Sequence, residues 1–272
     1  MPKYSIDDLL YLMSRLRDPE SGCPWDLKQD FASIVPHTLE EAYEVADTIE
    51  REDWGHLNDE LGDLLFQVIF YTQLGKEADS FDFDSVVTNL VSKLIRRHPH
   101  VFPEGTLHSQ RDGKSIDDEA IKRNWEMIKQ QEREEKEKAG SSRILDDIPK
   151  VLPALNRAVK LQKRASQVGF DWNEAETVLD KIEEEIAEVR QAIRSGDQAA
   201  VADEMGDVLF AQVNLARHLQ VNPESALRGT NDKFTRRFSY VEDQVIKSGR
   251  EWDSFSLSQL DAFWDEAKAL GL

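Results

Sequence analysis

The chain has 272 residues, of which 40% are hydrophobic, and this length favours two domains, each with its own core. Its formal net charge of −19 disfavours nucleic acid as a standing partner, because phosphate backbones are bound by basic patches. No apolar run is long enough for a membrane span or a signal peptide, and the one cysteine excludes an internal disulfide framework, so a cytoplasmic protein is expected.

Hydrophobic periodicity predicts one helix after another and no alternating strand run. In the first half the expected helices cover residues 6–16, 38–51, 54–74, 83–98 and 117–138. Ser5, Thr38 and Ser115 each precede an acidic residue by three positions, which is typical of a helix N-cap. The polar run Gln130–Lys138, followed by Ala139–Ser142, indicates a linker, so domains of residues 1–139 and 140–272 are expected.

The second half repeats landmarks of the first half in the same order. The corresponding segments are Glu40–Glu44 with Glu184–Glu188, Glu60–Asp63 with Glu204–Asp207, Lys93–Arg97 with Lys233–Arg237, and Trp125–Lys129 with Trp264–Lys268. The first two segments of each half start 20 residues apart in both copies. This repeat predicts two tandem copies of one all-α, helical-bundle domain.

The acidic segments of the second half lie beside apolar helix faces. Glu204 shares a stripe with Val208, Ala211 and Leu215, and Asp207 lies on the same side. On the preceding helix the expected core stripe comprises Ile182, Ile186, Val189 and Ile193. Glu185 and Glu188 follow the flank of that stripe, so a hairpin of the two helices can bring four carboxylates together.

Such a group of carboxylates requires a cation. Two like charges ~4 Å apart repel by up to about 4 kcal/mol at an effective dielectric of 20. Ligands that are all oxygen favour Mg²⁺ or Mn²⁺ over zinc. A di-iron bundle would need a histidine one turn after a ligand, but Gln191 and Asp207 follow Glu188 and Glu204 at that spacing.

Basic and aromatic residues near these segments suit a phosphate-containing substrate. Lys181 shares the helix face of Glu184, and Lys233 and Arg237 are four residues apart on a later helix. Trp264 and Lys268 can offer a stacking plane and a charge to a nucleotide. A glycine-rich phosphate loop is absent, so the chemistry that fits is attack of a metal-activated water on phosphorus, with a free glutamate taking its proton.

The combined motifs resemble the MazG family of nucleoside triphosphate pyrophosphohydrolases. Besides the Glu-Glu-x-x-Glu and Glu-x-x-Asp segments, the resemblance rests on Cys23-Pro24-Trp25-Asp26 and on Arg97-His98-Pro99-His100-Val101-Phe102. It covers the whole chain and implies Mg²⁺-dependent hydrolysis of ATP and other nucleoside triphosphates between the α and β phosphates. It also implies NMP and pyrophosphate as products, broad base tolerance, a homodimer of intertwined helices and activity in the second repeat.

The resemblance assigns roles residue by residue. The implied metal ligands are Glu185, Glu188, Glu204 and Asp207, and the implied catalytic residues are Glu184, Glu185 and Lys181. The implied nucleotide contacts are Lys181, Glu184, Lys233, Arg237, Trp264, Lys268 and Lys129. The first repeat keeps Glu41, Glu44, Glu60 and Asp63 as a second metal site but has His37 where the second has Lys181, so a weakly active or regulatory role is expected for it.

Two alternatives remain at the level of sequence. A dUTP-specific or a phosphoribosyl-ATP pyrophosphohydrolase belongs to the same helical superfamily. A non-enzymatic acidic module that binds a regulatory partner protein is the other, because the family is linked to toxin-antitoxin and starvation regulation. Loss of Glu204 or Asp207 inactivates an enzyme but is tolerated by such a module.

Overall fold

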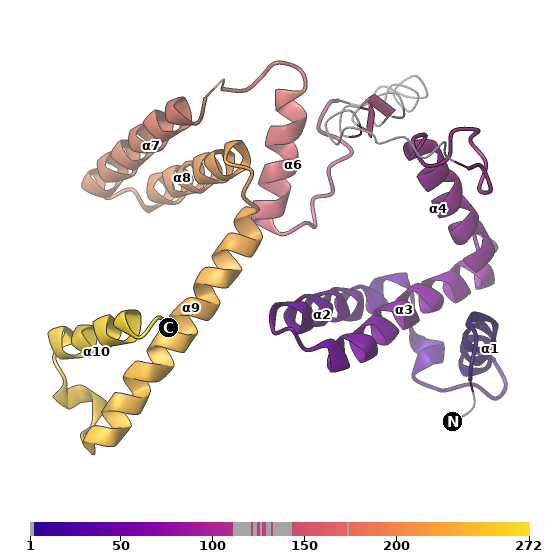
Figure 1. Cartoon of the computed structure of the whole chain (residues 1–272), viewed down its shortest axis with the longest axis horizontal. Coiled ribbons are helices and arrows are strands. Elements are labelled where there is room, and N and C mark those ends of the chain that lie inside the picture. The colour runs from indigo at the N-terminus through magenta and orange to yellow at the C-terminus, as the bar shows by residue number, and fades with distance from the viewer. Residues whose placement is uncertain are drawn as a thin grey trace. The chain divides into compact units, whose positions relative to one another are not determined.

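A computed structural model describes residues 3–110, 121, 124, 125, 127, 128, 132, 143–172 and 174–272. The described residues form helices and connecting turns without a strand, as the sequence predicts (Figure 1). Contacts divide the chain into two compact units, residues 1–136 and 137–272. Among the helices in the described ranges, none combines the length and the apolar character needed to cross a membrane.

The first unit is built on an antiparallel hairpin of two long helices. Its helices are α1 (Ile6–Leu16), α2 (Phe31–Glu50), α3 (Trp54–Glu77) and α4 (Phe83–Arg97), with a 3-10 turn at Asp26–Lys28. α2 packs along α3, and α1 and α4 each contact α3. Met13, Ile34, Ile69 and Phe70, which come from α1, α2 and α3, form the buried centre. The hydrophobic core of the first unit is therefore built around α3.

The residues at which the helices begin can be compared with the N-caps expected from the sequence. Ser5 caps α1, because its side chain accepts from the amide of Asp8 and Asp8 accepts in return. The expected cap at Thr38 is wrong. α2 begins at Phe31 with Asp30 as its cap, and Thr38 lies inside the helix, where its hydroxyl donates to the carbonyl of Ile34. Pro36 is tolerated in the second turn, where its missing N–H removes one backbone hydrogen bond. The expected cap at Ser115 lies outside the described residues.

Arg17 closes the segment that joins α1 to α2. Its side chain is 7% exposed, and its Nη2 lies 2.6 Å from Oε2 of Glu77 on α3. The guanidinium also donates to the carbonyls of Asp26 and Gln29. One buried cation thus holds the 3-10 turn of the connecting segment against the end of α3.

Replacing Arg17 by Met is expected to destabilise the first unit by about 2 to 3 kcal/mol, since a buried carbonyl, a partly buried carbonyl and a partly buried carboxylate lose their donor. Urea unfolding of the full chain, followed through the first unit's transition, measures the change. Arg15→Met, at an exposed position on the same helix, is the control and is expected within about 0.5 kcal/mol of the parent. Equal effects of the two variants would contradict the anchoring role.

The second unit repeats the hairpin and adds a second helix pair. Its helices are α6 (Ala154–Ser166), α7 (Ala175–Ser195), α8 (Gln198–His218), α9 (Pro223–Ser248) and α10 (Leu257–Ala269), with a 3-10 turn at Trp252–Ser254. α7 packs along α8, α6 packs on α8, and α10 packs on α9 (Figure 1). Gln162 joins α6 to α8 by donating to the carbonyl of Phe210 at 2.8 Å.

The buried stripe of α7 differs from the expected one. Val178, Ile182, Glu185 and Ala192 are its buried residues, whereas Ile186 and Ile193 are exposed. The expectation is wrong for those two isoleucines because the stripe follows a spacing of three and four residues through the small Ala192, which faces inward. Consequently Glu185 lies within the buried stripe and not along its flank.

Candidate metal and nucleotide site

The turn of each helix hairpin determines which carboxylates of its two helices lie opposite each other. In the second unit Gly196 adopts a left-handed conformation (φ 73°) and Asp197 caps α8 directly after it. Glu188 precedes Gly196 by eight residues and Glu204 follows it by eight, so antiparallel packing brings these side chains to one level. In the first unit Glu52 (φ 55°) is the corresponding residue, with Glu44 and Glu60 eight residues away on each side.

The second unit brings three of its four expected ligands together. Each of Glu185, Glu188 and Glu204 offers a carboxylate oxygen, and these oxygens lie within 4.8 Å of one another. We call these three residues the second-unit carboxylate group. The side chain of Glu185 is 8% exposed, and its Oε2 is buried without a hydrogen-bond partner. Asp207 is exposed and is not part of the group.

The electrostatics of this group are those of crowded negative charge. The pKa of Glu188 is raised, first because its protonated form can hydrogen-bond to Glu185, then because of burial and the charges of Glu185 and Glu204. Lys181 partly compensates: its Nζ lies 2.9 Å from Oε1 of Glu184 and 2.9 Å from Oε1 of Glu185. These two contacts, the one with Glu184 foremost, raise the pKa of Lys181. Glu184 is thus paired with the lysine beside the group.

The donor set fits a hard divalent cation. All of its donors are carboxylate oxygens, which Mg²⁺ and Mn²⁺ prefer. The buried and unpartnered Oε2 of Glu185 is the decisive observation, because a buried carboxylate oxygen without a partner is costly unless a cation binds it. Lys181 engages only Oε1 of that carboxylate, which leaves Oε2 available.

The first unit has a similar carboxylate group without the lysine. Oxygens of Glu41, Glu60 and Asp63 lie within 4.8 Å of one another. Burial, followed by neighbouring carboxylates that include Glu44, raises the pKa of both Glu41 and Glu60. His37 occupies the position of Lys181, and its Nδ1 lies 3.7 Å from Glu40, a residue outside the group.

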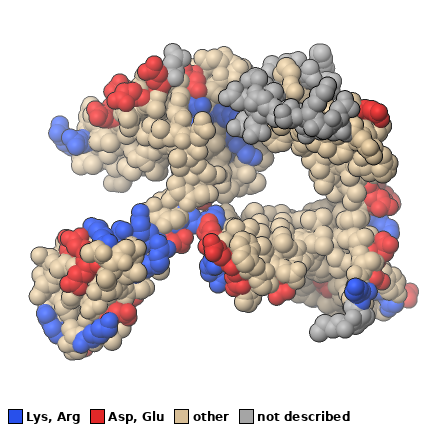
Figure 2. Space-filling view, viewed as in Figure 1, with Lys and Arg blue, Asp and Glu red and all other residues tan. Residues whose placement is uncertain are grey.

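Besides Lys181 and Glu184 on α7, the expected nucleotide-binding residues of the second unit lie on α9 and α10. The Arg237 guanidinium lies 5.8 Å from the centre of the Trp264 ring, and its Nε donates to the carbonyl of Leu272 at 2.7 Å. Lys233 lies one turn before Arg237, and Lys268 pairs with Asp265 at 2.9 Å. Figure 2 shows basic side chains gathered along α9 and acidic ones along α7. Lys129, the remaining expected contact, lies outside the described residues.

The two sets of candidates therefore occupy two different helix pairs of the second unit. The carboxylates and Lys181 belong to the α7–α8 hairpin, and the basic and aromatic residues belong to α9–α10 (Figure 1). α10 packs along α9, beyond the hairpin. Each set is assembled within the unit, but the structure does not bring both sets to one place.

An aromatic groove beside Trp264 was not expected from the sequence. It has a volume of about 260 Å³ and is lined mainly by Phe234, Phe238, Trp252, Leu257, Leu260 and Trp264. Phe234 lies 5.2 Å from Trp264, and Phe238 stacks on Trp252 at 5.8 Å, measured between ring centres. The signal for it was present, because Phe234 and Phe238 follow the same one-turn spacing as Lys233 and Arg237 on one helix.

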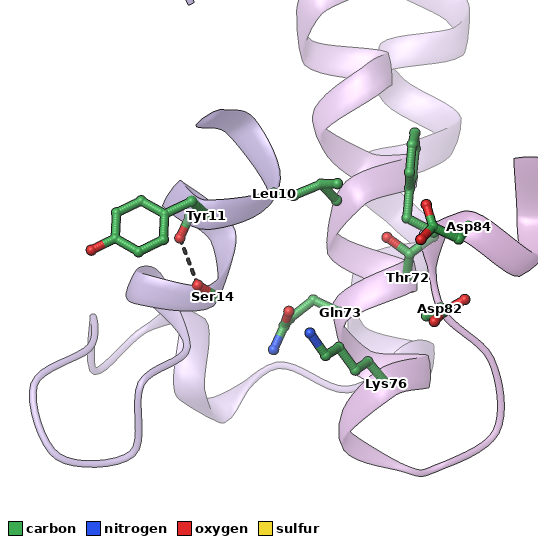
Figure 3. A pocket seen from close by; sticks show the side chains of 9 residues that line it. Leu10, Tyr11, Ser14, Thr72, Gln73, Lys76, Asp82 and Asp84 are labelled. Carbon is green, nitrogen blue, oxygen red and sulfur yellow. Dashed lines mark hydrogen bonds between the residues drawn. The ribbon is translucent and has the colours of Figure 1, made fainter. Parts of the chain in front are cut away.

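A second cavity, in the first unit, uses its polar groups for folding. It has a volume of about 230 Å³ and lies between α1, the end of α3 and the start of α4 (Figure 3). Asp82 caps α4, Gln73 donates to Glu77, and the Thr72 hydroxyl donates to the carbonyl of Ile69. These contacts explain the polar walls of the cavity without a ligand.

Comparison with known proteins agrees with the tandem hairpins. The model of the MazG nucleotide pyrophosphohydrolase domain matches residues 29–102 and again residues 173–241. The nucleoside triphosphate pyrophosphohydrolase of Escherichia coli K12 is 49% identical over 265 residues, which cover 97% of each chain. The nucleoside triphosphate pyrophosphohydrolase/pyrophosphatase MazG of Thermotoga maritima is 41% identical over 97% of this chain and 95% of its own. The chain therefore belongs to the MazG family of nucleotide pyrophosphohydrolases.

Proposed function

We propose that this enzyme hydrolyses nucleoside triphosphates between the α and β phosphates, giving NMP and pyrophosphate, with Mg²⁺ as cofactor and Mn²⁺ as a substitute. The observation that carries the proposal is the unpartnered, buried Oε2 of Glu185 within the second-unit carboxylate group. The Escherichia coli and Thermotoga maritima relatives, both named as nucleoside triphosphate pyrophosphohydrolases, support the same reaction. When bound, the cation supplies an activated water and neutralises phosphate oxygens.

The residues of the second unit have distinct roles in this proposal. Glu185, Glu188 and Glu204, joined by Asp207, hold the cation, and Glu184 accepts the proton of the attacking water. Lys181 neutralises charge that develops on the phosphates. The remaining substrate contacts are Lys233, Arg237, Trp264, Lys268 and Lys129. The exposed aromatic faces beside Trp264 suit stacking of bases of any kind, which supports broad base tolerance.

The proposal assigns catalysis to residues 140–272 and a weakly active or regulatory role to residues 1–139. The absence of a lysine at His37 supports this division. We propose a homodimer, because Ile186, Ile193 and Leu209 expose apolar surface on the hairpin and because the two sets of candidates lie on separate helix pairs. A cytoplasmic role in nucleotide-pool cleaning and stress regulation, with a regulatory protein partner, completes the proposal.

Product analysis tests the reaction. The full chain is incubated with a panel of nucleoside triphosphates, including dUTP, and with phosphoribosyl-ATP, with Mg²⁺ and with a chelator, and products are separated by chromatography. NMP and pyrophosphate from several bases, formed only with the cation, are expected. NDP and phosphate would overturn the bond assignment, and turnover of dUTP or phosphoribosyl-ATP alone would overturn the substrate class. No turnover with any of them would favour the partner-binding module.

A further inference from the structure

The two arginines that end α4 share one side-chain carboxylate, that of Glu132. Arg96 and Arg97 both bind the carboxylate of Glu132, with Nη2 of Arg96 2.6 Å from Oε1 and Nη2 of Arg97 2.6 Å from Oε2. Nε of Arg97 adds a third contact, 3.2 Å from Oε2. Arg237, the counterpart of Arg97, instead contacts the Trp264 ring and a backbone carbonyl.

The Glu132 carboxylate makes the contacts that a phosphate group would make with Arg97. Nε of Arg97 lies 3.3 Å from Oε1 and Nη2 lies 2.6 Å from Oε2, and two N–H donors that meet two oxygens form the geometry with which arginine recognises phosphate. The side chain of Glu132 is 16% exposed, and hydrogen bonds from Arg97, the largest cause, and from Arg96 lower its pKa to about 2. At neutral pH the carboxylate is therefore charged.

The repeat shows that this carboxylate is specific to the first unit. Glu132 follows Trp125 by seven residues, and the residue seven positions after Trp264 is Gly271, which has no side chain to offer. An incoming triphosphate must displace a carboxylate that engages both Nε and Nη2 of Arg97, whereas Leu272 engages Arg237 at Nε through one main-chain oxygen.

We propose that Glu132 is a specificity-determining residue: it occupies the phosphate-reading arginine of the first repeat and so confines triphosphate binding to the second repeat. The inference rests on the proposed function in taking triphosphate as the ligand. It is independent of the His37 difference, because Arg97 lies on another helix.

Binding of two probes to the full chain tests this inference. Calorimetry with the uncleavable α,β-methylene analogue of ATP, in Mg²⁺, is expected to show one site per wild-type chain and two sites for Glu132→Gln. Glu132→Gln is also expected to show an added site for inorganic tripolyphosphate. The affinity of this site is expected to be at least about tenfold higher than that of any tripolyphosphate binding by the first repeat of the wild type, since the N–H groups of Arg97 become available for charge-assisted hydrogen bonds. Glu132→Gly, which copies the second repeat, is expected to behave in the same way.

Two controls identify the cause. The double variant Glu132→Gln, Arg97→Gln is expected to lose the added site. Glu104→Gln removes the same charge from an exposed position and is expected to leave one site. Folding is checked by the thermal unfolding midpoint, so that the better folded of the two Glu132 variants decides the result.

The outcomes separate this inference from the proposed function. A folded Glu132 variant with no added tripolyphosphate site, or an added site that survives loss of Arg97, overturns the inference. Failure of the wild type to bind the nucleotide analogue overturns the proposed function. The tripolyphosphate measurement still decides on Glu132 in that case, because it requires only an anion and Arg97.

Discussion

Glu185→Gln is expected to lower nucleoside triphosphate turnover at least roughly 10³-fold, because loss of about 4 kcal/mol of transition-state stabilisation corresponds to that factor. Glu185 is the buried member of the second-unit carboxylate group, so its amide leaves the cation without its innermost ligand. The same change is expected to stabilise the metal-free chain by about 1 kcal/mol, since repulsion from Glu188 and Glu204 falls by more than the contact with Lys181 contributes.

The two effects are measured separately, as initial rates with Mg²⁺ and as thermal unfolding in a chelator. Glu41→Gln is the matched control, because Glu41 has the same place in the first-unit hairpin, and it is expected to keep most of the turnover. An equal loss of turnover in the two variants would contradict the assignment of catalysis to the second unit. Lower metal-free stability of Glu185→Gln would show that Lys181, and not the repulsion, dominates the energetics of the group.

Lys181→His is expected to lower turnover roughly 10²-fold at neutral pH, as removal of one charged donor from an active site does. It places in the second unit the residue that stands at this position in the first. The lysine is charged throughout the neutral and alkaline range because Glu184 and Glu185 raise its pKa. A histidine is charged mainly below about pH 6.5, so the deficit of the variant is expected to narrow below that pH and to widen above it.

A pH–rate profile of Lys181→His beside the parent chain makes this measurement. The control is His37→Lys, which introduces the same cation beside the first-unit carboxylates and is expected to leave turnover unchanged, because Arg97 there remains bound to Glu132. A constant ratio of the two rates across the pH range would show that Lys181 acts through its shape or packing and not through its charge.

The order and type of the helices could be predicted from the sequence, but their starts and faces only in part. The bounds of α1 are those expected, since apolar spacing and the Ser5 cap agree there. α2 starts earlier than expected because Thr38, three residues before Glu41, suggested an N-cap, whereas Asp30 is the cap in the structure. The face of α7 could not be fixed, because isoleucines occur on two sides of the helix and only packing against α8 selects one.

The candidate site, like the helices, could be predicted only in part. Spacing identified the carboxylates on each helix, and the hairpin brings Glu185, Glu188 and Glu204 together. Equal distance from the turn at Gly196 explains why Glu188 and Glu204 meet, but it would also pair Glu185 with Asp207, which stays outside the group. The position of α9 and α10 could not be inferred, since periodicity gives the face of a helix and not its packing partner. Glu132 was missed because a single glutamate in the polar run Gln130–Lys138 carries no signal of its own.

Because Glu188 and Glu204 lie at equal distances from the left-handed turn at Gly196, metal binding depends on the number of residues between that turn and each ligand. One residue inserted in α8 between Gln198 and Glu204 would rotate Glu204 by about 100° around the helix axis and advance it by about 1.5 Å relative to α7. Glu204 would then leave the level of Glu188 although every ligand was still present. The number of residues between Glu188 and Glu204 is therefore a requirement of the site in its own right, beside the identity of the ligands.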